Sequence, residues 1–82
     1  MELRLGVGDI IEVIGWVMLK GLDDGKRYKV ARIEKHFMGD VYYFSKPKGK
    51  KIVIGHYCYD VDGYINNSNN NRIEIVEKSI LK

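Results

Sequence analysis

Apolar residues in this chain fall into short runs that are rich in valine, isoleucine and tyrosine, and glycine-containing breaks separate the runs. Such runs between turn residues are typical of β-strands. No segment places apolar residues at helical spacing over a window of about 11 residues. The pattern therefore predicts an all-β fold with five strands, at residues 9–17, 27–35, 41–46, 51–59 and 72–77.

The second predicted strand carries an irregularity in its pattern. Tyr28 and Val30 lie two residues apart and share one face of a strand, whereas Ile33 falls on the other face. One extra residue in a β-bulge can bring such side chains back to a single face. A bulge near Ala31 is therefore expected, because it would let all three apolar side chains enter one core.

The segment 58–69 contains Asp60-Val-Asp62-Gly63, a spacing found in calcium-binding EF-hand loops. If Gly63 takes the glycine position of such a loop, Cys58 occupies the first ligand position and Asn69 the twelfth. A soft sulfur and one neutral oxygen would then replace the carboxylates needed there. We therefore expect a polar turn between the last two strands. In that turn Asp60 or Asp62 accepts backbone N–H bonds, and Gly63 has a positive φ.

The length of 82 residues predicts one domain, spanning residues 1–82. A domain of this size buries only roughly 60–65% of the surface of its unfolded chain, so a deep cleft is hard to house. The single cysteine excludes an internal disulfide and favours a reducing compartment. No apolar run approaches the ~20 residues that span a bilayer, and the first residues lack the apolar core of a signal peptide. The expected location is the cytoplasm, without membrane contact.

Catalytic and metal-binding chemistry has little support in the residue types present. The imidazoles and the thiol are those of His36, His56 and Cys58. A zinc site needs three or four ligands, and nucleophilic catalysis would need a base and an oxyanion hole beside Cys58. We expect no catalytic residue, no metal and no cofactor, and hence a protein that acts by binding rather than as an enzyme.

Positive charge is concentrated in the middle of the chain. The net charge is +3, and residues 20–51 alone carry ten basic against four acidic residues. A surplus of this kind favours anionic partners such as DNA or RNA, although lysines at a hairpin turn can also serve only to keep a β-rich protein soluble. The expected nucleic-acid contacts are Lys46, Lys48, Lys50 and Lys51 in the turn, Arg27 and Lys29 on the second strand, and Tyr42 as a ring that stacks on bases.

A long loop after the first strand contains four consecutive apolar residues: Trp16, Val17, Met18 and Leu19. Such a run either fills the core or forms an exposed patch that binds a partner. Tyr59 and Tyr64, which flank the Asp-rich turn, would add to an exposed patch. We favour this protein-interaction function over nucleic-acid binding, with another protein or a second copy of the chain, in a homodimer, as partner.

The asparagine-rich run 66–71 is of low complexity and cannot bury apolar area. Together with the many Lys, Ile and Tyr residues, it indicates an A/T-rich coding genome, such as that of a phage or mobile element. Small binding domains from such a source often act on a host protein. This indication of origin also favours a protein partner.

The order of the predicted elements resembles that of Src-homology-3-like small barrels of the bacterial, translation-factor and Tudor kind. VGDIIEVIG (7–15) is similar to their first strand, RYKVARI (27–33) to their second, and YYFSKPKGKKIVIG (42–55) to their central hairpin. The resemblance covers residues 7–77 and leaves 78–82 as a tail that could form one helical turn. It implies a single five-stranded small barrel, with a short helical turn before the last strand within DGYINNSNNN (62–71).

Overall fold

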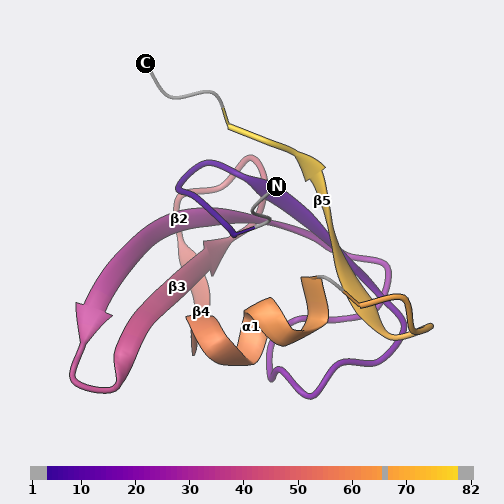
Figure 1. The fold of residues 1–82 in the computed structure, drawn as a ribbon. Coiled ribbons are helices and arrows are strands. Elements are labelled where there is room, and N and C mark those ends of the chain that lie inside the picture. The colour runs from indigo at the N-terminus through magenta and orange to yellow at the C-terminus, as the bar shows by residue number, and fades with distance from the viewer. Residues whose placement is uncertain (1–3, 66, 80–82) are drawn as a thin grey trace.

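The computed structural model describes residues 4–65 and 67–79, which form one antiparallel five-stranded sheet and one short helix (Figure 1). The strands are β1 (Ile10–Ile14), β2 (Arg27–His36), β3 (Gly39–Ser45), β4 (Ile52–Tyr57) and β5 (Arg72–Glu77). The helix α1 (Cys58–Ile65) stands between β4 and β5 in the chain. The predicted fold is therefore confirmed as mostly β with five strands. One short helix, α1, accompanies the strands.

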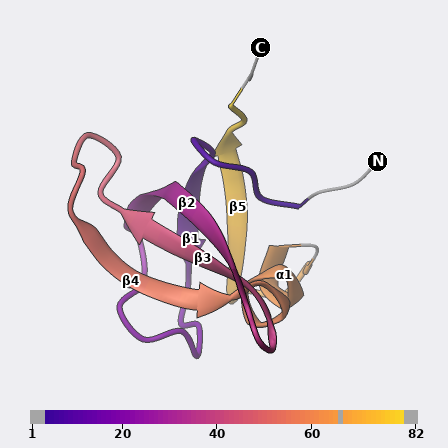
Figure 2. The same ribbon diagram turned by 90° about the vertical axis from the view of Figure 1, so that its left-hand side faces the viewer.

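The strands lie side by side in the order β4-β3-β2-β1-β5. β1 pairs on one side with β2 and on the other with β5, so the sheet brings the first and last strands of the chain together. The strand directions rotate across the sheet, as the right-handed twist of β-sheets requires, and the sheet curls around the core (Figure 2). Within residues 4–65 and 67–79 no ladder joins β4 to β5. The sheet is open at these two edges, and a closed barrel is not confirmed.

β2 contains the predicted bulge. Its pairing with β3 shifts between Val30 and Arg32, which leaves Ala31 outside the register. Beyond the bulge Ile33 lies opposite Tyr42, which is buried, and Ile33 itself packs against the core. The prediction is confirmed, and the cause is the change of phase between the two halves of the strand.

α1 occupies residues for which the sequence pattern predicts the end of a strand and a polar turn. β4 ends at Tyr57, and the helix places Val61 wholly in the core, with Cys58 and Ile65 packed beside it. These three positions follow one another at intervals of three and four residues, which is the spacing of one helix face. A helix of eight residues is too short to fill the longer window in which helical periodicity is sought.

The predictions of a turn here and of a positive φ at Gly63 are wrong for the same reason. Gly63 lies inside α1, and the glycines with a positive φ are those at positions 8, 15, 21, 25 and 39. The Asp62 carboxylate accepts a hydrogen bond from the Tyr42 hydroxyl at 3.1 Å and so ties the helix to β3. The short helix before the last strand, which the resemblance placed within residues 62–71, is present but begins earlier, at Cys58.

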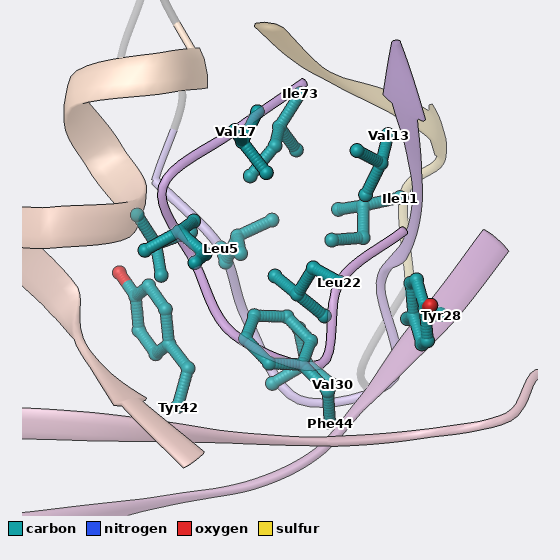
Figure 3. Packing of buried hydrophobic residues seen from close by; sticks show 12 residues of the cluster. Leu5, Ile11, Val13, Val17, Leu22, Tyr28, Val30, Tyr42, Phe44 and Ile73 are labelled. Carbon is teal, nitrogen blue, oxygen red and sulfur yellow. The ribbon is translucent and has the colours of Figure 1, made fainter. Parts of the chain in front are cut away.

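The hydrophobic core lies between the curled sheet, α1 and the loop that joins β1 to β2 (Figure 3). The strands contribute five side chains that are entirely buried: Ile11, Val13, Val30, Phe44 and Ile73. The loop contributes three more buried side chains: Val17, Leu19 and Leu22. Burial of an aliphatic side chain stabilises a fold by roughly 1.5–3 kcal/mol relative to exposure. The loop is therefore part of the core rather than an appendage to it.

A buried carboxylate holds the two ends of the described chain together. Asp9 is 1% exposed, and it accepts hydrogen bonds from the backbone N–H groups of Gly6 and Ser79 and from Nζ of Lys78, each at 2.7 Å. Lys78 Nζ also donates to the carbonyl of Arg4 at 2.6 Å. Lys78 and Ser79 are not helical, and the remainder of the helical turn considered for 78–82 lies outside the described residues.

Candidate functional site

The β1–β2 loop divides its four consecutive apolar residues between the core and the solvent. Val17 and Leu19 are each 5% exposed, whereas Trp16 is 70% and Met18 75% exposed. In an extended segment alternate side chains point to opposite sides. The expectation of core packing therefore holds for Val17 and Leu19, and the expectation of an exposed patch holds for Trp16 and Met18. Val17 and Leu19 are wrong as interaction residues, because they fill the core. Trp16 and Met18 together are called the loop patch below.

The backbone under the loop patch is held by side chains from distant parts of the chain. The N–H of Trp16 donates to Oδ1 of Asn71 at 2.8 Å, and the N–H of Met18 donates to the Tyr64 hydroxyl at 2.9 Å. Tyr64 packs against the core, and it therefore supports the patch instead of forming part of its exposed surface. These bonds, with the buried side chains between them, fix the positions from which Trp16 and Met18 project.

Two further contacts close the loop. The N–H of Gly15 donates to Oδ1 of Asp24 at 2.8 Å, and Nε2 of His56 lies 2.7 Å from the carbonyl oxygen of Lys20. Residues 16–24 of the loop line an open groove of about 430 Å³. The last two of these residues, Asp23 and Asp24, are acidic. A partner that covers the loop patch would therefore also meet a depression next to it.

A second group of exposed apolar side chains lies at the tip of the β2–β3 hairpin. Phe37 and Met38, in the turn, are 102% and 62% exposed, and Tyr59 at the start of α1 is 52% exposed. The ring of Tyr59 stacks on that of Tyr57 with 5.3 Å between ring centroids, and it also lies against Gly39 of the hairpin. Tyr59 was expected to share a surface with Tyr64, but the structure places it here instead. We call Phe37, Met38 and Tyr59 the tip patch.

The lysine-rich turn lies at the opposite end of β3 from the tip patch (Figure 2). Its four lysines, at positions 46, 48, 50 and 51, are all exposed as expected. Lys29 of β2 lines the same groove as Lys50, and Arg27 lines the same groove as Lys46. The structure therefore brings the two predicted β2 cations to the lysine turn, and it adds Lys26, which sequence reasoning missed.

Tyr42 does not belong to this surface. Its side chain is 1% exposed, and it points into the core beside Phe44, with the two rings in an edge-to-face arrangement. Burial, together with the charge of Asp62 and the hydrogen bond to it, raises the pKa of Tyr42 to about 12. The prediction that Tyr42 stacks on bases is wrong, because its position on β3 faces inward.

The side chains with catalytic or metal-binding potential are dispersed over the fold. His36 lies 3.1 Å from the hydroxyl of Tyr43, His56 contacts the β1–β2 loop, and Cys58 packs against the core. Across residues 4–65 and 67–79 there is no group of three or more His, Cys, Asp or Glu side chains that could hold a metal ion. Over the same residues no helix has the length and apolar character needed to cross a membrane.

Comparison of the chain with models of protein families, with curated proteins and with solved structures gives no match. Three surfaces of the chain are candidates for its function: the loop patch, the tip patch and the cations around the lysine turn.

Proposed function

We propose that this chain is a non-enzymatic binding module that contacts another protein through the loop patch. One observation carries the proposal: Trp16 and Met18 are held in solvent by a loop whose alternate residues are buried and whose N–H groups are bonded to Asn71 and Tyr64. Large apolar side chains that a fold fixes in an exposed position are typical of interaction sites.

The residue types fit a protein partner. Tryptophan is among the residues most enriched at the energetic centre of protein interfaces, and methionine is enriched at interfaces generally. Covering each side chain would contribute roughly 1.5–3 kcal/mol, of which part is lost to ordering on binding. Because the backbone of the loop is already fixed, the part of that cost that comes from ordering the backbone is small. The groove beside the patch offers a place for a side chain of the partner.

We also propose that the sheet is curled in the manner of an SH3-like small barrel. The strand order β4-β3-β2-β1-β5 and the short helix before β5 support this arrangement. The proposal concerns architecture alone, because such folds host unrelated functions. The protein-binding function depends on the loop patch and not on the fold class.

The test compares proteins captured by the wild-type chain and by two variants. Trp16→Ser removes the centre of the loop patch, and Val53→Ser is the matched control, because Val53 is an exposed apolar residue on β4. A partner that is captured by the wild type and by Val53→Ser, and lost with Trp16→Ser, is then purified and its affinity measured. We expect Trp16→Ser to weaken that affinity by about 30-fold or more, which corresponds to a loss of at least 2 kcal/mol.

Self-association is tested with the same variants by sedimentation. A dimer that dissociates in Trp16→Ser but not in Val53→Ser would make a second copy of the chain the partner. The melting temperature of each variant shows whether it is folded. Equal affinity of wild type and Trp16→Ser for the purified partner would refute the proposal.

A further inference from the structure

The cations around the lysine turn form a second surface, independent of the loop patch. Lys46 and Lys50 each line two of the three grooves at this end of the molecule, so the grooves adjoin one another around the turn. The grooves measure about 290, 430 and 480 Å³. Seven cationic residues belong to this surface, which we call the basic end: Lys26, Arg27, Lys29, Lys46, Lys48, Lys50 and Lys51.

Few carboxylates balance these charges. Glu12 pairs with Arg27 at 2.9 Å, and Asp23 lines the same groove as Lys26. Within the described parts of the chain, none of the six lysines forms an ion pair with a carboxylate. Their charges remain available for an external anion, and the basic end therefore has a strong positive potential.

The arrangement of the cations indicates the form of that anion. They are spread over the lysine turn and the start of β2 instead of converging on one point, and all of them except Lys29 are exposed. A single small anion would be held by convergent donors, whereas a chain of phosphates can meet cations that are distributed over a surface. The basic end therefore fits a linear polyanion with closely spaced charges.

No exposed aromatic ring is among the described residues that line the three grooves. Tyr28 lines a groove with Lys46 but is 6% exposed, and Phe44 is fully buried. The exposed rings of Phe37 and Tyr59 lie at the other end of β3. Without a ring on which a base can stack, single strands gain no advantage, and the higher charge density of a duplex favours the duplex.

We propose that the basic end binds the phosphate backbone of duplex nucleic acid without sequence preference. Five lysines line the grooves, at positions 26, 29, 46, 50 and 51, and they are enough to neutralise about four phosphates. Neutralising about four phosphates makes the affinity fall roughly 100-fold between about 50 and 200 mM salt. This activity goes beyond the proposed protein binding and does not require the loop patch.

The experiment titrates the full chain into labelled DNA duplexes of about 25 base pairs at the two salt concentrations. Two unrelated sequences are expected to bind with affinities that agree within about twofold, and a single strand of equal length more weakly. Lys46→Glu and Lys50→Glu are each expected to lower the affinity about tenfold and to reduce the salt slope. The matched control is Lys35→Glu, which makes the same charge change at an exposed site near the tip patch.

Each alternative has its own outcome. An equal loss of affinity in Lys35→Glu would show that net charge alone acts, and it would overturn the assignment to the basic end. Displacement of the duplex by polyglutamate at equal charge concentration would indicate an acidic protein as ligand and would also overturn it. So would absence of binding by the folded wild type at low salt. Trp16→Ser is expected to bind DNA as the wild type does, so failure of either proposal leaves the other testable.

Discussion

The side chain of Asp9 is the charged group on which the closure of the two chain ends depends. Its carboxylate is removed from water and bonded by two backbone N–H groups and the Lys78 ammonium. The carboxylate stabilises the fold through these hydrogen bonds, which are stronger than bonds between neutral groups. If Asp9 lost its charge, the buried donors would be left with a weaker acceptor.

Asp9→Asn is expected to lower the free energy of unfolding by about 2–3 kcal/mol, as seen for hydrogen bonds to buried charged groups. The substitution removes the charge that Lys78 pairs with, and one of the two acceptor oxygens. Urea unfolding measures the change. Glu74→Gln is the control, since it alters an exposed carboxylate paired with Arg72, and it should change stability by less than about 0.5 kcal/mol. An equal effect of the two substitutions would contradict the role given to Asp9.

The same group sets a direction for the pH dependence of stability. Burial raises the pKa of the Asp9 carboxyl, but hydrogen bonds from Lys78, Gly6 and Ser79 outweigh burial and leave the pKa below its ordinary value. The stabilisation is therefore complete above the pKa of the unfolded chain and is lost as the pH falls through the lower folded pKa. Urea unfolding at about pH 6 and pH 3 should show a steeper acid loss in the wild type than in Asp9→Asn.

At the scale of elements, the helix α1 gives a test in which the two interpretations of one segment predict opposite signs. If Gly63 were a turn residue at positive φ, its replacement would destabilise the fold. Inside α1, however, Gly63 is the residue with the lowest helix propensity, so its replacement would stabilise the fold. A Cβ added to Gly63 would meet no atom within 4 Å. Gly63→Ala is therefore expected to raise the free energy of unfolding by about 0.5–1 kcal/mol, measured with urea. Destabilisation would indicate that the segment is a turn after all.

The β1–β2 loop depends on a close approach at Gly15. This glycine has a φ of 75°, and a Cβ there would collide with the Asn70 carbonyl and the Asn71 side chain. Gly25 is a matched control in the same loop, because its φ is 77° and its Cβ would stand in open space. Both alanine variants bear the cost of a positive φ, about 1–2 kcal/mol, but only Gly15→Ala adds the collision.

We expect Gly15→Ala to be less stable than Gly25→Ala by at least about 1 kcal/mol in urea unfolding. It should also weaken the capture of a protein partner, because the Trp16 backbone is bonded to Asn71. Equal stability of the two variants would show that the loop does not depend on its contact with residues 70–71.

For the molecule as a whole, the sequence predicts the number of strands and the bulge, because both follow from the local pattern of apolar residues. The period of apolar residues indicates five strands, and β5 has the predicted bounds, 72–77. The phase change in β2 predicts its bulge. β1 ends at Ile14, earlier than predicted, because Gly15 takes a positive φ that leaves the sheet.

What the sequence could not predict depends on contacts between distant residues. α1 is held by Val61 in the core, and its eight residues are too few to show periodicity. Which of Trp16 and Val17 is buried depends on the direction in which the loop crosses the core. The gathering of Lys29 and Arg27 with the lysine turn requires the pairing of β2 with β3. The lysine turn itself could be recognised, because its four lysines fall within six residues of sequence.

Asp9 and Lys78 hold the first and last described segments of the chain beside each other, which affects how the domain could be joined to another polypeptide. Because Lys78 Nζ bonds the carbonyl of Arg4, the backbones of residues 4 and 78 lie no more than one lysine side chain apart. A domain whose first and last described segments are adjacent in this way suits insertion into a surface loop of a host protein. The host would then stand next to the basic end, because Gly8 lines a groove with Lys50 and lies against Ser79, whereas the loop patch follows the opposite end of β1.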